Sequence, residues 1–169
     1  DGGEVDYLSQ HKGISPESAR EMLDRVTGVA ADAGLAYRFD ILKHTNTVKA
    51  HELLHFAKEN GKQLELAEVL MSAYFLEGKH VGRDDDLVAL AVEVGLDEAE
   101  AREALASQRF RAAVRADQEQ AHQFGITGVP FFVIDGKYGV SGAQPVEAFS
   151  QIARQVWGER REATETADA

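Results

Sequence analysis

Apolar residues recur at helical spacing through most of the first 124 positions of the chain. A helix is predicted wherever a capping residue precedes such a stripe and a glycine follows it. Ser15 before Pro16 marks one helix start, and Asp97 with Glu100 marks another in a variant of the capping box. The predicted helices span about 16–34, 46–61, 64–78, 84–95, 97–107 and 109–124.

The helix at 64–78 has a distinctive composition. Between Leu66 and Leu76 its apolar residues surround nearly the whole circumference. A surface helix has an apolar stripe on one side only. This helix is therefore predicted to be buried among other helices.

The pattern changes after Gly125. The runs PFFVI and YGVSG are short and β-prone, and the turn Asp135-Gly136-Lys137 separates them, which predicts a β-hairpin. A last helix is predicted from Pro145 to Trp157, and residues 158–169 are predicted to form a disordered tail. The residues expected on the apolar face of that helix are Val146, Phe149, Ile152, Ala153 and Val156.

A hairpin of two strands is only marginally stable in water unless further strands or a packed partner support it. The helix at 145–157 can cover only one face of the hairpin. We therefore expect missing strands or a partner chain, and self-association or element swapping if neither is present.

Composition excludes several functions. The chain has 169 residues, 44% of them hydrophobic, and a formal net charge of −11. This charge argues against nucleic acid and against an anionic membrane surface, because both require a basic patch. Apolar runs such as Val129–Ile134 are too short to cross a bilayer. The sequence contains no cysteine, so disulfide content gives no information about its compartment.

The segment His51-Glu52-Leu53-Leu54-His55 has the H-E-x-x-H pattern of zinc peptidases. In that chemistry the two histidines, one helical turn apart, bind zinc, and the glutamate activates a bound water. No third ligand follows at a recognisable spacing, and Glu52 is predicted to lie with His55 on a solvated side of the helix. A zinc metallopeptidase is therefore an outside alternative, and no metal is expected.

The stretch Gly125–Pro145, together with NTVKAHELLHFA at 46–57, resembles the FrnE branch of the DsbA-like thiol–disulfide oxidoreductases. The resemblance covers nearly the entire chain. It implies an α/β class: an incomplete thioredoxin-like fold dominated by an all-helical insertion, with a C-terminal β-hairpin and helix. The insertion would be residues 1–124, and the returning half of the thioredoxin-like domain would be 125–157.

The same resemblance implies a substrate-binding site. Thr127, Gly128, Val129 and Pro130 match the loop in which the family has a cis proline. The backbone of Val129 would pair with an extended substrate, and Pro130 would lie beside the reactive sulfur. Asn46, His51 and His55 are candidates to face the substrate cleft.

The absence of cysteine is the main departure from the family. The family's nucleophile is a thiolate at a helix N-terminus, so this chain alone is expected to be inactive in dithiol exchange. We expect a fragment or truncated form that lacks the strand–helix–strand bearing C-x-x-C. The resemblance implies protein or small-thiol substrates, no metal or organic cofactor, and the bacterial cytoplasm. A glutathione-dependent isomerase, whose thiol comes from its cofactor, and a non-catalytic binding module of the same fold are the alternatives.

Overall fold

The computed structural model describes residues 3–167. These residues form two compact units, and the boundary between them lies between Asp117 and Gln118. The boundary falls inside a helix and precedes the domain boundary that the sequence predicted after residue 124.

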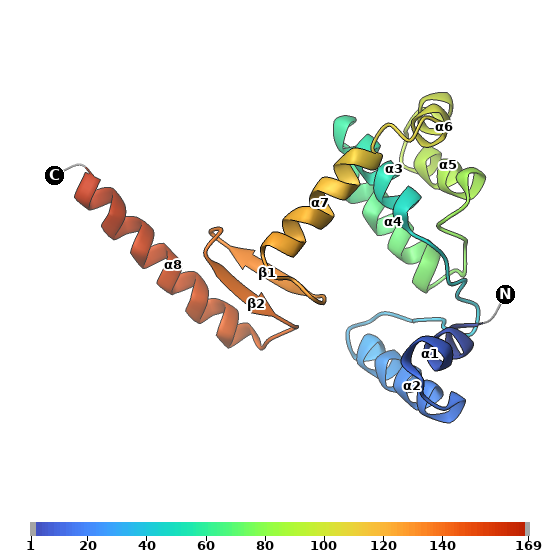
Figure 1. Ribbon diagram of the computed structural model, residues 1–169, viewed down its shortest axis with the longest axis horizontal. Helices are drawn as coiled ribbons and strands as arrows, with labels where there is room; N and C mark the ends of the chain where they lie inside the picture. The colour runs from blue at the N-terminus through green and yellow to red at the C-terminus, as the bar shows by residue number, and fades with distance from the viewer. Residues whose placement is uncertain (1–2, 168–169) are drawn as a thin grey trace. The chain divides into compact units, whose positions relative to one another are not determined.

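The first unit is entirely helical in the part of the chain that the structure describes (Figure 1). Its N-terminal helix was not predicted, because its single buried residue, Leu8, leaves no apolar stripe to detect. The caps at Ser15 and Asp97 are confirmed: the two side chains accept hydrogen bonds from the backbone N–H groups of Ser18 and Glu100. The helices are α1 (Glu4–Lys12), α2 (Pro16–Asp32), α3 (Val48–Glu59), α4 (Gln63–Phe75), α5 (Asp84–Glu93), α6 (Glu98–Ala106) and α7 (Arg111–Gln123), which continues past the unit boundary.

Helices α3, α4, α5 and α6 pack around one hydrophobic core, and α1 packs against α2. Leu53, Leu66 and Leu87 are fully buried in this core. The prediction that α4 is buried on all sides is wrong, because only one stripe of it faces the core. Leu66, Leu70 and Ala73 are buried, whereas Met71 is 61% exposed.

The second unit contains an antiparallel hairpin of β1 (Phe131–Ile134) and β2 (Tyr138–Ser141). Phe131 pairs with Ser141, and Ile134 pairs with Tyr138. In the three-residue connection, Asp135 and Gly136 both have positive φ, and the N–H of Lys137 donates to the carbonyl of Ile134 at 3.2 Å to close the turn. The predicted mostly helical fold with one small hairpin is therefore confirmed.

Helix α8 (Val146–Ala167) follows the hairpin and runs beside it (Figure 1). The predicted apolar face is correct for Phe149, Ile152 and Val156, which are at least half-buried, and wrong for Val146 and Ala153, which are exposed. The prediction of disorder after Trp157 is also wrong as far as Ala167, because the helix continues and Glu159 and Arg160 bind the hairpin turn. Residues 168–169 lie outside the described part.

None of the helices between residues 3 and 167 combines the length and the apolar character needed to cross a membrane.

Candidate functional site

The predicted site residues lie in both units. Asn46, His51 and His55 belong to the first unit, and Thr127–Pro130 belong to the second. Each group is described within its own unit.

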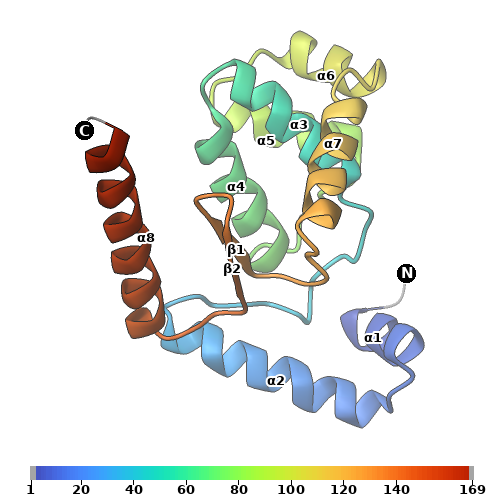
Figure 2. The same cartoon turned by 60° about the vertical axis from the view of Figure 1, so that its left-hand side comes forward.

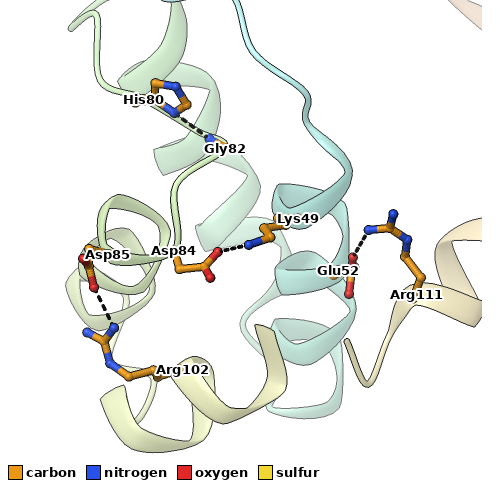
Figure 3. Close-up of polar contacts among 8 residues, drawn as sticks. All are labelled: Lys49, Glu52, His80, Gly82, Asp84, Asp85, Arg102 and Arg111. Carbon is orange, nitrogen blue, oxygen red and sulfur yellow. Dashed lines mark hydrogen bonds and ion pairs between the residues drawn. The ribbon is translucent and has the colours of Figure 1, made fainter. Parts of the chain in front are cut away.

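Asn46 lies just before α3, where its side-chain oxygen accepts a hydrogen bond from the N–H of Val48 at 2.9 Å. This segment contacts the loop at 80–82 closely, since a Cβ on Gly82 would lie 2.3 Å from Oγ1 of Thr45 and 2.9 Å from the carbonyl oxygen of Asn46. Only glycine fits there without a shift. The N–H of Gly82 donates to Nδ1 of His80 at 3.1 Å, which holds the loop in place (Figure 3). Asn46 is exposed, and the segment that carries it is in close contact with the loop at 80–82.

Charged pairs fix the neighbouring helices. The Lys49 ammonium binds Asp84 at 2.6 Å and ties α3 to the start of α5, and Arg102 binds Asp85 at 2.6 Å and ties α6 to the same helix (Figure 3). Carboxylates at the first turn of α5 are also favoured by its helix dipole. These pairs are partly exposed, so they orient the helices more than they stabilise them.

Glu52 does not lie on a solvated face, and that prediction is wrong. The side chain is 1% exposed, and its Oε1 accepts a hydrogen bond from the Arg111 guanidinium of α7 at 2.9 Å (Figure 3). The reason is that side chains of α7 reach this side of α3, which the sequence of α3 alone does not reveal.

His55 is also bound by α7. Its Nε2 lies 2.8 Å from Oδ2 of Asp117, and its ring stacks on Phe110 with centroids 6.3 Å apart. His51, one turn earlier, is exposed.

The zinc alternative fails on this geometry. The would-be base Glu52 is buried and directed at the Arg111 guanidinium. Among residues 3–167, no group of three His, Asp or Glu side chains is arranged to hold a metal ion.

The loop at 125–130 joins α7 to β1 in the second unit. Thr127, Gly128, Val129 and Pro130 are all exposed, and the exposed fraction of Val129 is 91%. The Val129–Pro130 peptide bond is cis. The carbonyl of Pro130 accepts a hydrogen bond from the N–H of Gly142 at 2.9 Å, which anchors the end of the loop to the hairpin. Within the described chain, the backbone N–H and C=O of Val129 make no hydrogen bond.

A polar cluster attaches α8 to the hairpin. Glu159 accepts hydrogen bonds from the Lys137 ammonium at 2.7 Å, from the Tyr138 hydroxyl and from the Gln155 amide. These donors lower the pKa of Glu159 from 4.5 to about 2, the Lys137 bond contributing most. The same bond raises the pKa of Lys137. Asp135 in the turn binds Arg160.

Sequence reasoning missed the partners that surround these residues, namely Arg111, Asp117 and Glu159. Each binds a residue at least 21 positions away. No local pattern could have identified them. The only sequence signal close to any of these contacts was the Asp135-Gly136 turn, which predicted that the two strands lie next to each other.

Comparisons with known proteins identify the family. Residues 4–154 match the family described as the DSBA-like thioredoxin domain. The crystal structure of a probable DsbA oxidoreductase from Streptomyces coelicolor superposes with a TM-score of 0.86 at 43% identity, and the match covers 94% of this chain and 68% of that one. The chain belongs to the DsbA-like thioredoxin domain family.

Two further relatives give the limits of the match. The uncharacterized protein YwbO of Bacillus subtilis is 34% identical over 125 residues, which are 73% of this chain and 62% of that protein. This chain therefore spans less than two thirds of the length of YwbO. The crystal structure of a candidate protein disulfide isomerase from Nitrosomonas europaea has a TM-score of 0.69 at 17% identity, and the match covers 92% of this chain and 88% of that one. At that identity the likeness concerns the fold alone.

Proposed function

We propose that this polypeptide supplies the helical cap and the substrate-docking loop of a FrnE-type protein thiol–disulfide oxidoreductase. The redox cysteines of that enzyme would come from residues outside this sequence. The observation that carries the proposal is the membership of residues 4–154 in the DsbA-like family in a chain with no cysteine.

The chemistry requires sulfur that this chain does not contain. In thiol–disulfide exchange a thiolate attacks one sulfur of a disulfide, a mixed disulfide forms, and the other sulfur leaves as a thiolate. We propose that the chain contributes binding to this reaction. An extended substrate segment would pair with the N–H and C=O of Val129, which have no partner within residues 3–167.

The unpaired strand edges of the second unit also support the proposal. The sheet consists of β1 and β2 alone among the described residues, so each strand has an unpaired edge. Phe132 packs on Phe149 of α8 with ring centroids 4.9 Å apart. Strand side chains alternate, so Phe131 and Val133 point to the face away from α8, and Val133 is 37% exposed. Further strands and a covering helix would complete such a sheet.

The remaining parts of the proposal concern the cellular role. Substrates would be proteins or small thiols, with no nucleic acid, membrane, metal or organic cofactor involved. The enzyme would act in the bacterial cytoplasm. Thr127 and Gly128 would shape the docking loop, with Pro130 beside the sulfur and Asn46, His51 and His55 at the border of the cleft.

The absence of cysteine favours one second candidate. In a glutathione-dependent isomerase of related fold, the thiol is that of the bound glutathione, so the protein itself needs none. The two candidates differ in one measurement. The measurement is glutathione binding. If the chain is an isomerase, the 169-residue chain itself binds glutathione, whereas an oxidoreductase depends on cysteines of the protein.

The test uses the protein encoded by the complete reading frame, in an insulin-reduction or dithiol-oxidation assay. Val129→Pro removes the backbone N–H and is expected to lower kcat/KM roughly 3- to 10-fold, the value of one hydrogen bond. Val129→Ala keeps the N–H and should leave the rate unchanged, since the side chain is 91% exposed.

Two results would contradict the proposal. One is a complete reading frame without any cysteine. The other is equal activity of the Val129→Pro and Val129→Ala enzymes, which would remove the docking role of this loop.

A further inference from the structure

Two hollows on the surface of the first unit share one wall, the side chain of Tyr37. The smaller has a volume of about 230 Å³ and includes Leu35, Met71 and Phe75 in its lining. The larger has a volume of about 370 Å³ and includes Val5, Leu23 and Phe39. We call the two hollows together the Tyr37 groove.

Tyr37 is held firmly between them. Its ring stacks on Phe75 with centroids 4.8 Å apart at 15°, and Phe39 meets it edge-on at 5.6 Å. The backbone beside it is fixed as well, because the N–H of Arg38 donates to the carbonyl of Phe75 at 2.8 Å. This segment, between α2 and α3, runs along α2 (Figure 2). The groove is therefore formed before any ligand binds, which lowers the entropy cost of binding.

The groove exposes apolar side chains that a folded protein normally buries. Met71 is 61% exposed and Leu35 is 44% exposed. A flexible, polarizable methionine accommodates apolar groups of different shapes. Contiguous exposed apolar surface next to polar residues is typical of binding sites.

The charges at the rim favour a cationic ligand. Asp24 and Glu68 line the hollows, and neither has an ion-pair partner within residues 3–167. Asp40 is compensated by the two-pronged contact of Arg38, which also lowers the pKa of Asp40. Arg20 is the one cation in the lining. Two carboxylates against one guanidinium, in a chain of net charge −11, attract positive charge.

We propose that the Tyr37 groove binds an extended polypeptide segment that carries two apolar side chains and net positive charge. One apolar side chain enters the hollow on each side of Tyr37. In an extended chain, side chains two positions apart point the same way at a spacing of about 7 Å, so neighbouring hollows of this size suit them. A second copy of this chain is disfavoured as the occupant of this groove, because its net charge of −11 does not complement the carboxylates at the rim.

The inference rests on the proposed function, in which the substrates are proteins. It specifies which unfolded segments are preferred, and it places their recognition at a surface that is separate in sequence from Val129.

The test measures binding rather than turnover, with the 169-residue chain. A fluorescent heptapeptide with phenylalanine and leucine two positions apart, flanked by lysines, is titrated in a fluorescence-anisotropy experiment. Two matched peptides replace either the apolar pair with serines or the lysines with glutamates. The first peptide is expected to bind roughly tenfold more tightly than either control, because each control removes one source of affinity.

Variants locate the site. Met71→Ser removes an apolar contact and Asp24→Lys reverses a rim charge, and each is expected to weaken binding at least threefold. The matched controls are Val92→Ser on α5 and Glu103→Lys on α6. Both residues are exposed and lie outside the groove, so these variants should bind like the parent chain.

Three outcomes would overturn the inference: equal affinity for the three peptides, equal effects of groove and control variants, or concentration-dependent self-association that Met71→Ser abolishes. None of these results concerns cysteine chemistry. A reading frame without cysteine would remove the proposed activity and leave the peptide affinities as measured, so the two failures are distinguishable.

Discussion

Glu52 is a buried carboxylate held by one strong contact. Its Oε1 binds Arg111, while its Oε2 has no hydrogen-bond partner in the described chain. A buried carboxylate depends on its cation, because the protein interior cannot replace the water that the charge has lost. The pair therefore makes α3 sensitive to a single residue of α7.

We expect Arg111→Ala to lower the free energy of unfolding by about 2–4 kcal/mol, because the variant leaves the Glu52 charge buried without a partner. This expected loss is toward the lower end of the range for breaking a buried ion pair, because the Arg111 side chain is 38% exposed. Denaturant unfolding followed by circular dichroism measures the change.

The matched control is Arg109→Ala, two residues earlier. Arg109 binds Glu59 at 2.6 Å, but both side chains are about half exposed. Solvent screens that pair, so its loss should cost less than about 1 kcal/mol. Equal losses from the two substitutions would refute the argument from burial.

The hairpin and α8 stabilise each other through one apolar and one polar contact region. Phe132 packs on Phe149 near the start of the helix, and Glu159 gathers its three donors further along. Neither element alone buries much surface. The polar cluster should therefore control how firmly the helix is attached.

We expect the attachment of α8 to weaken at low pH. The pKa of Glu159 in the folded chain is about 2, below its ordinary value of 4.5. The stabilisation is therefore complete above pH 4.5 and is lost as the pH falls toward 2. Amide NMR signals of β1 and β2, followed during thermal unfolding from pH 6 to pH 2, report the effect.

Glu159→Gln removes the charge and should lower the unfolding temperature of the hairpin at pH 6. The difference from the parent chain should become small as the pH falls to 2, because about half of the parent's Glu159 is then protonated. Glu147→Gln, in the exposed first turn of α8, serves as the control. A difference between Glu159→Gln and the parent that is the same at both pH values would contradict the assignment.

The chain as a whole combines a first unit with a well-packed core and a second unit with a small two-stranded sheet. The core of α3–α6, together with Val81 and Phe110 from adjoining segments, is one cluster of buried side chains. The sheet of β1 and β2 has two unpaired edges within the described residues. Unpaired edges readily pair with another chain.

We expect the 169-residue chain to self-associate through the hairpin. Analytical ultracentrifugation should show a mean mass that rises with concentration. Val133→Lys places a charge on the face of β1 that lies away from α8 and should shift the chain toward monomer. Val92→Lys on α5, at a similarly exposed position, is the control. A chain that stays monomeric at all concentrations would contradict this prediction.

Features that depend on a few neighbouring residues were predictable without a structure. The caps at Ser15 and Asp97 and the turn at Asp135–Gly136 are examples, because the groups that interact lie within three positions of each other. The order of helices, then a hairpin, then a last helix was predicted for the same reason. The family resemblance added the docking loop, whose role stays a prediction.

Contacts between distant parts of the chain were decided only by the tertiary structure. Glu52 is buried because Arg111, 59 positions away, lies beside it. The last helix continues beyond Trp157, where Glu159 binds Lys137, 22 positions earlier. The Tyr37 groove needs residues of α1, α2 and α4 together. A linear pattern records which side chains are available, but burial and pairing depend on which of them the folded backbone brings within a few ångströms.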